Sequence, residues 1–148
     1  MSKILLIILL TLSAVADTFI VQNNSSSIEF SVKKFFFLNI EGRFTKFKGK
    51  ITLDDNHMIA SINGLVDAAS ADMGDAKREV DLKEEAYLNS LKYPYIEFKA
   101  ISTDDEELEA TISIKGIVQK VKFNIDKMEL VNSKLILTIS AILHRDAF

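Results

Sequence analysis

The sequence predicts an all-β domain of about seven or eight antiparallel strands, arranged as a barrel or a sandwich, with one helical insertion. Three observations support this prediction. Apolar and polar residues alternate with a period of two over most of residues 17–148, as expected for strands with one buried and one exposed face. Polar, turn-forming residues separate the alternating segments. A single stretch, residues 75–90, is rich in helix-forming residues instead.

The N-terminus has the layout of a secretory signal peptide. Lys3 precedes an apolar run over residues 4–12, and Ala14-Val15-Ala16 supplies small residues at a cleavage site. The run is shorter than the roughly 20 apolar residues of a transmembrane helix. We therefore expect a signal peptide over residues 1–16, one domain over residues 17–148 and no stable membrane insertion. An N-terminal anchor or a buried strand is the alternative.

The strand pattern is clearest in four segments with polar residues between them. The alternating segments are residues 28–32, 107–115, 121–126 and 135–143. The turn signals are Asn39 and Gly42, residues 54–56, Asp104-Asp105 and Asn132-Ser133. Lys115-Gly116 interrupts a long alternating run, so we expect a β-bulge or a sharp bend there. Eight strands closed into a barrel leave no open edge and can enclose one small ligand.

The helical segment begins near Asp75, which is a suitable N-cap residue. Apolar residues then follow at nearly helical spacing; they are Val80, Leu82, Ala86, Tyr87 and Leu88. We expect one or two short helices that end before Tyr93-Pro94, because a residue that precedes proline avoids the α conformation.

Composition argues against several kinds of chemistry. A net charge of −3 offers no basic surface for nucleic acid, and the absence of cysteine excludes disulfides, thiolate zinc sites and a cysteine nucleophile. His57 and His144 are expected to be exposed or structural, and residues 104–107 to form a solvated acidic turn. No hydrolase, zinc-protease or phosphate-loop spacing is present. We expect no enzymatic activity, metal or cofactor, and an exported chain without cysteine suits the bacterial periplasm.

A basic stretch and a set of aromatic residues each allow two interpretations. Arg43, Lys46, Lys48 and Lys50 form either an exposed strand face or a site for an anionic head group near a cavity rim. The chain has ten phenylalanines and no tryptophan. These side chains form either a packed core or the apolar wall of a lipid cavity, where each buried CH₂ of a ligand contributes about 0.8 kcal/mol.

Six motifs in a fixed order extend over nearly all of residues 17–148. They are SSIEFSV (26–32), GRFTKFKGKI (42–51), ASADMGDAKREVDL (69–82), YPYIEFKA (93–100), ISIKGIVQKVKF (112–123) and RDAF (145–148). In this order they resemble the YceI-like family, the polyisoprenoid-binding proteins of bacterial periplasms. The resemblance implies an extended lipocalin-like antiparallel β-barrel with one or two short helices across one side.

The resemblance also implies a function. Family members hold isoprenoid chains such as quinones or polyprenyl phosphates, and in some cases fatty amides, in a long apolar tunnel. It implies carriage or storage of an isoprenoid or other long-chain lipid, and often a homodimer. Because the family usually continues beyond the position of Phe148 through a final strand, we expect one barrel edge to be open or to be covered by a partner.

Several polar family positions differ in this chain. Ser25 and Asp81 stand where the family has histidines, Glu79 replaces an aspartate and Met73 replaces a threonine. Arg78 is retained, so it is the polar ligand-binding candidate. A buried arginine needs a partner, which Glu79, Asp81 or a ligand phosphate would supply; an arginine that joins the helix to the barrel is the alternative.

The alternation predicts which side chains line the tunnel, although a one-residue error would invert a strand. The predicted lining residues are Phe30, Val32, Phe44, Phe47, Ile62, Ile96, Phe98, Ile112, Ile114, Val121 and Phe123. Two alternatives remain. One is a packed β-domain that acts through protein partners. The other is a lipid-modifying enzyme, which would need an inward acid or base; Arg78 and Arg145 with nearby carboxylates are the only candidates.

Overall fold

The strands form two antiparallel sheets that together make a nearly closed barrel. The computed structural model describes residues 17–34, 38–83 and 88–144. Its strands are β1 (Asp17–Ile20), β2 (Ile28–Lys34), β3 (Leu38–Phe44), β4 (Phe47–Leu53), β5 (Ile59–Asp67), β6 (Ala71–Asp72), β7 (Tyr95–Thr103), β8 (Glu107–Ile114), β9 (Ile117–Val131) and β10 (Lys134–Ser140). The predicted all-β antiparallel barrel is therefore confirmed.

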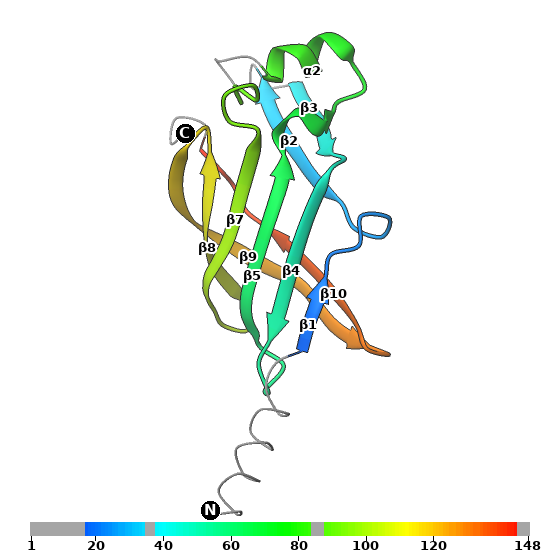
Figure 1. Cartoon of the computed structure of the whole chain (residues 1–148), viewed down its shortest axis with the longest axis vertical. Helices are drawn as coiled ribbons and strands as arrows, with labels where there is room; N and C mark the ends of the chain where they lie inside the picture. The colour runs from blue at the N-terminus through cyan, green and yellow to red at the C-terminus, as the bar shows by residue number, and fades with distance from the viewer. Residues whose placement is uncertain (1–16, 35–37, 84–87, 145–148) are drawn as a thin grey trace, which may run out of the picture.

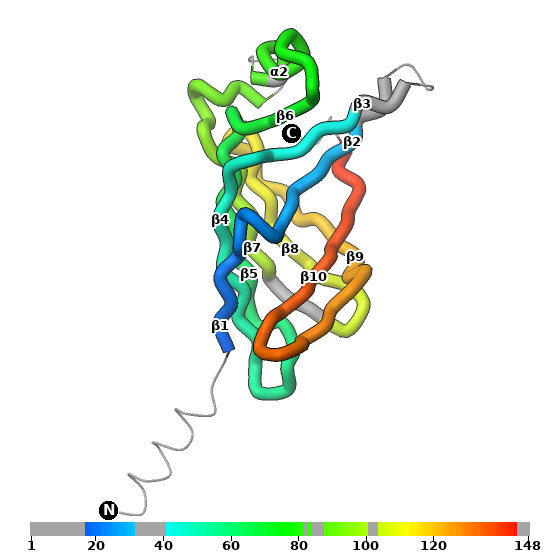
Figure 2. Tube along the Cα trace, turned by 90° about the vertical axis from the view of Figure 1, so that its right-hand side faces the viewer, coloured from blue at the N-terminus to red at the C-terminus, as the bar shows by residue number. Residues whose placement is uncertain are grey.

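The larger sheet forms most of the barrel wall. Its seven strands follow the order β1-β4-β5-β7-β8-β9-β10, and the smaller sheet has the order β2-β3-β6. The larger sheet curls so that β9 and β10 cross behind β4 and β5 (Figure 1), while β2 and β3 pass over the upper part of the opening (Figure 2). Among the described strands, β10 pairs only with β9 and β1 only with β4, so the wall is not closed by a β-ladder between them.

The helix lies at one end of the barrel, beside β3 and β6 (Figures 1 and 2). Helix α2 covers Ala76–Lys83, and a short 3₁₀ helix covers Ala68–Ser70. Asp75 caps α2 as predicted, since its Oδ1 accepts hydrogen bonds from the backbone N–H groups of Lys77 (2.9 Å) and Arg78 (3.3 Å). The sequence predicts one or two short helices within residues 75–90. Residues 84–87, with Ala86 and Tyr87, lie outside the described residues, and residues 88–90 are not helical.

Three of the predicted turns are confirmed, and the predicted bulge or bend at Lys115-Gly116 is a hairpin turn. Asp54 and Asp104 each accept two backbone hydrogen bonds from residues that follow them, so both acidic turns are confirmed. Asn132-Ser133 forms the hairpin turn between β9 and β10 with positive φ angles of 51° and 64°. Lys115 and Gly116 also have positive φ, 56° and 74°, so they reverse the chain in a two-residue hairpin rather than bending one strand.

The prediction of a turn at Asn39 and Gly42 is wrong. Both residues lie within β3, where Gly42 pairs with Phe30 of β2. A Cβ atom at Gly42 would lie 2.5 Å from Phe30 Cζ and 3.0 Å from Met73 Cγ. Glycine is therefore required here because an aromatic ring covers the backbone, and not because the chain turns.

The best-packed part of the core fills the barrel end opposite α2. Leu53, Ile59, Ile62 and Leu108 form one buried cluster, and both leucines are 0% exposed. They come from the end of β4, from the first part of β5 and from the start of β8, where the β4–β5 and β7–β8 turns lie (Figure 1). We call this the closed end, and the end that carries α2 the helix end.

Candidate ligand cavity

The inner face of the barrel is formed by alternate residues of the long strands. Cross-strand register places Phe98 opposite Ile112, and Val121 opposite Ala110. Phe123 lies opposite Leu108 and, like Phe98, packs against the closed-end cluster. Because directly opposite residues share one face of a sheet, these side chains point into the barrel.

The predicted lining residues differ in how deeply they are buried. Phe47, Ile62 and Ile112 are buried. Seven others remain partly accessible; they are Phe30, Phe44, Ile96, Phe98, Ile114, Val121 and Phe123. The side chain of Val32 lies outside the described residues. A packed sandwich would bury such inward-facing residues almost completely, so the inner wall keeps accessible apolar surface between the closed end and the helix end.

Two ring contacts mark the upper and lower parts of this wall. Near the helix end, the rings of Phe30 and Phe44 lie 5.1 Å apart in a tilted arrangement. Toward the closed end, Phe98 and Phe123 meet edge to face with centroids 5.2 Å apart. Both distances fall in the range of favourable aromatic pairs. Four of the ten phenylalanines therefore form two ring pairs on the wall.

Two opposed glycines, which the sequence reasoning missed, lie beside Phe98. Gly49 of β4 pairs directly with Gly64 of β5, on the inner face. A Cβ at Gly64 would meet only Phe98 Cβ at 3.5 Å and the Lys48 carbonyl oxygen at 3.9 Å. At Gly49, Val21 Cγ2 would lie 3.0 Å away. The sequence signal for this pair was a glycine at each of two inward positions of the alternating pattern. In the structure, the absence of a side chain at these positions leaves room beside Gly64.

The inner face of β9 also carries a polar residue that the sequence reasoning missed. Gln119 lies opposite Ile112 and is partly buried. Its amide can both donate and accept hydrogen bonds. The signal was available in the alternation, since Gln119 has the same phase as Val121 and Phe123.

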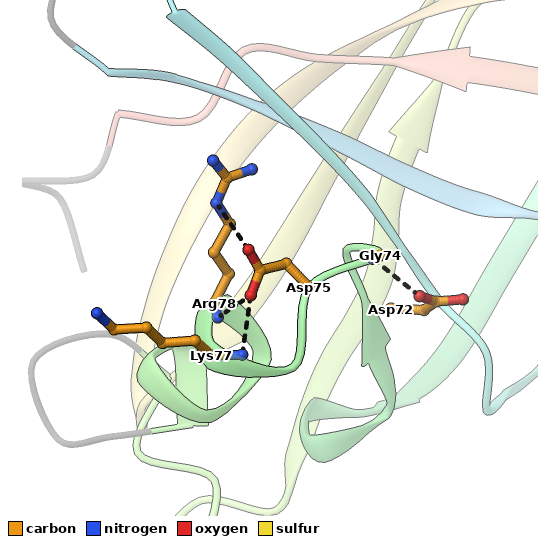
Figure 3. Close-up of polar contacts among 5 residues, drawn as sticks. All are labelled: Asp72, Gly74, Asp75, Lys77 and Arg78. Atoms are coloured by element: carbon orange, nitrogen blue, oxygen red, sulfur yellow. Dashed lines mark hydrogen bonds and ion pairs between the residues drawn. The ribbon is translucent and has the colours of Figure 1, made fainter.

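Arg78 is exposed, so it is not the buried arginine for which partners were predicted from the sequence. Its side chain is 46% exposed, and Nε lies 3.9 Å from Asp75 Oδ2 (Figure 3). The partner is therefore the N-cap residue of its own helix rather than Glu79 or Asp81. Arg145, the second candidate cation, lies outside the described residues.

The predicted basic stretch is divided between two surfaces. Lys46, Lys48 and Lys50 are exposed on the outer face, as one interpretation expected. Arg43 instead lies in an open pocket of about 510 Å³, where its Nη2 is 3.6 Å from Asp72 Oδ2. The pocket is lined by Glu29, Phe30, Ser31, Glu41, Gly42, Arg43 and Asp72.

The remaining chemical candidates behave as surface groups. His57 and His144 are exposed, as expected. Across the described ranges, no three histidine or carboxylate side chains come together in a way that would hold a metal ion. No helix in those ranges has the length and apolar character needed to cross a bilayer.

Comparison with known proteins identifies the relatives of this barrel. The chain is 27% identical over 105 residues to the protein YceI of Escherichia coli O157:H7, which covers 68% of this chain and 55% of that protein. It is 28% identical over 106 residues to a UPF0312 protein of Shewanella denitrificans, covering 65% of this chain and 53% of that protein. The chain thus spans about half the length of these curated relatives.

A solved structure and a family model agree with these relatives. The crystal structure of BcnA from Burkholderia cenocepacia superposes with a TM-score of 0.76 at 21% identity, over 86% of this chain and 83% of that one. This similarity supports the fold. The model of the YceI-like domain matches residues 19–148, which include every strand of the barrel except the first two residues of β1. On this match, the chain belongs to the YceI-like family.

Proposed function

We propose that the protein binds a long apolar lipid of the isoprenoid type inside the barrel and carries or stores it. The observation that supports this most is the accessible apolar inner wall. Its inward-facing residues alternate with exposed polar residues on the same strands, yet several remain partly accessible. An apolar chain inserted there would cover this surface and gain about 0.8 kcal/mol for each CH₂ removed from water.

The shape of the wall favours a long, thin ligand. Phe30 and Phe44 lie toward the helix end, Phe98 and Phe123 lie toward the closed end, and the glycine pair leaves room beside Phe98. A flexible hydrocarbon can follow such a path along the barrel axis. Gln119 supplies one polar group on an otherwise apolar stretch of wall, as is usual for cavities that orient apolar ligands.

The composition of the inner face also favours binding over catalysis. The inner-face positions of the long strands whose side chains the structure describes carry apolar or glycine residues apart from Gln119. General acid–base catalysis would need an acid or base within reach of the substrate. Periplasmic carriage is part of this proposal and rests on the signal peptide predicted over residues 1–16; homodimer formation stays a prediction.

The first test is to ask what the exported protein contains. The chain is expressed with its N-terminal segment in a bacterial host, purified from the periplasm, and examined by native mass spectrometry and solvent extraction. We expect a bound apolar chain in the purified protein, or uptake of added isoprenoid by the empty form. A protein that accumulates in the cytoplasm would refute periplasmic carriage, and one that takes up no isoprenoid or fatty chain would refute the binding role.

A matched pair of variants tests whether the ligand lies in the barrel. Gly64→Leu places a branched side chain on the inner wall, where the native backbone leaves room. Asn63→Leu places the same side chain on the outer face of β5, opposite Lys50 and Lys99. We expect at least tenfold weaker isoprenoid binding for Gly64→Leu and unchanged binding for Asn63→Leu, with circular dichroism confirming that both fold. Equal binding by both variants would contradict a ligand at this position.

A further inference from the structure

Exposed apolar side chains gather around the helix end of the barrel. Leu91 is 98% exposed, Val118 at the start of β9 is 62% exposed, and Val80 of α2 is 57% exposed. Single exposed apolar residues are ordinary, but neighbouring ones on adjacent segments indicate a contact surface.

Leu91 is held outward by the backbone around it. The Asn89 carbonyl accepts hydrogen bonds from the N–H groups of Lys92 (3.1 Å) and Tyr93 (2.9 Å), and the Ser90 N–H donates to the Lys83 carbonyl (3.0 Å). Leu91 therefore lies at the apex of a closed turn that is tied to the end of α2. Because these bonds fix the turn, the side chain does not fold back onto the barrel.

The β8–β9 turn lies next to this loop. A Cβ at Gly116 would lie 2.9 Å from Tyr93 Cε1, so the Tyr93 ring covers the turn that precedes Ile117 and Val118. The ammonium group of Lys92 lies 5.4 Å from the centre of the Tyr93 ring. Lys115 belongs to the same turn. We call Leu91, Lys92, Tyr93, Lys115 and Val118 the rim patch.

The packing of the closed end bears on where a ligand could leave the barrel. The buried leucines Leu53 and Leu108 fill that end, whereas the inward-facing Ile96 of β7 and Ile114 of β8 keep part of their surface accessible toward the helix end. Ile117 is partly exposed on the inner face next to the rim patch, opposite Ile114. An apolar ligand in the barrel therefore has its path to the exterior on the side where the rim patch lies.

We infer that the rim patch docks the barrel onto a bilayer with anionic head groups, so that the ligand exchanges with the membrane at the helix end. This inference rests on the proposed lipid-binding function. Leu91 and Val118 would enter the interface, where tyrosine is also favoured. Lys92 and Lys115 supply the charge complementary to anionic lipids, and each lysine near such a surface contributes about fivefold to partitioning.

The test compares the double variant Leu91→Ser/Val118→Ser with a matched control, Val131→Ser/Ile136→Ser. The control removes two exposed aliphatic side chains from the β9–β10 hairpin, which projects away from the helix end (Figure 1). Sedimentation with phosphatidylglycerol–phosphatidylcholine vesicles measures docking, and farnesol binding in solution measures the cavity. We expect at least tenfold weaker vesicle binding for the rim variant, and wild-type vesicle binding for the control.

A third variant, Lys92→Gln/Lys115→Gln, tests the charge. We expect it to lose most of the preference for vesicles that contain phosphatidylglycerol over pure phosphatidylcholine vesicles. The docking inference is overturned if the wild-type protein does not sediment with vesicles, if the rim variant sediments as well as the control, or if the lysine variant keeps the full preference. Failure of the wild-type protein to bind farnesol would overturn the cavity proposal instead, because that assay contains no membrane.

Discussion

The closed end and the inner wall are built from the same kinds of residues but differ in packing. At the closed end, aliphatic side chains from β4, β5 and β8 bury one another almost completely. Along the wall, several inward-facing aliphatic and aromatic side chains of β7, β8 and β9 keep part of their surface accessible. The difference shows that an alternating strand contributes to stability at one end and can form a binding surface further along.

The largest expected difference in stability is between substitutions of two isoleucines, one in the closed-end cluster and one on the inner wall. Ile59 belongs to the closed-end cluster, whereas Ile114 lies on the inner face near the helix end. Ile59→Ala should lower the free energy of unfolding by about 3 kcal/mol, because it leaves a cavity in packed surroundings, and Ile114→Ala by about 1 kcal/mol. Urea unfolding measures both, and equal losses would remove the distinction between core and wall.

A second pair of substitutions compares Gly42, which is covered by neighbouring side chains, with Gly64, which has free space beside it. Gly42→Ala would force Phe30 and Met73 to move, since the added Cβ would lie within 3.0 Å of both, and should destabilise the protein by about 1–3 kcal/mol. Gly64→Ala meets no atom closer than 3.5 Å, so its effect should be within about 0.5 kcal/mol. Thermal unfolding of the two variants checks this. A Gly64→Ala variant as unstable as Gly42→Ala would show that the inner wall beside Gly64 is tightly packed.

The smallest effect concerns the turn at the closed end. Hydrogen bonds from the backbone N–H groups of Glu107 and Glu106 lower the pKa of Asp104 below its ordinary value of 3.8. A lowered folded-state pKa means that the stabilising contribution is present above the unfolded-state pKa and is lost as the pH falls through the folded-state value. Asp104→Asn keeps an acceptor but cannot titrate, so its melting temperature should fall less than the wild-type value between pH 5 and pH 2. Equal decreases in melting temperature for the two proteins over this pH range would contradict the prediction.

The sequence predicted those features that depend on local chemistry or strict periodicity. Alternation placed Phe98, Ile112 and Phe123 on one face, and the register of β7, β8 and β9 confirms this placement. Asp54, Asp75 and Asp104 were identified because their carboxylates hydrogen-bond to backbone a few residues away. Such interactions need no knowledge of distant strands.

The errors arose where distant segments decide the outcome. Gly42 has the local signal of a turn, but its conformation is set by pairing with Phe30 in another strand. Glu79, Asp81 or a ligand phosphate was the expected partner of Arg78, whereas α2 presents this side chain outward beside Asp75. The opposed glycines Gly49 and Gly64 become meaningful only when the register of β4 and β5 is known. Whether the lining residues contact a ligand stays a prediction.

The order of strands in the larger sheet also bears on how the chain reaches this structure. From β4 to β10, the strands of that sheet pair in the order in which they follow one another along the chain, with β6 of the smaller sheet inserted between β5 and β7. Tight turns connect β8, β9 and β10. Pairings between segments close in sequence lose less chain entropy and form faster than distant ones. The meander from β8 to β10 can therefore form early, whereas β1 must close a loop from residue 17 to residue 53. The side of the barrel next to β1 is accordingly expected to order late during folding.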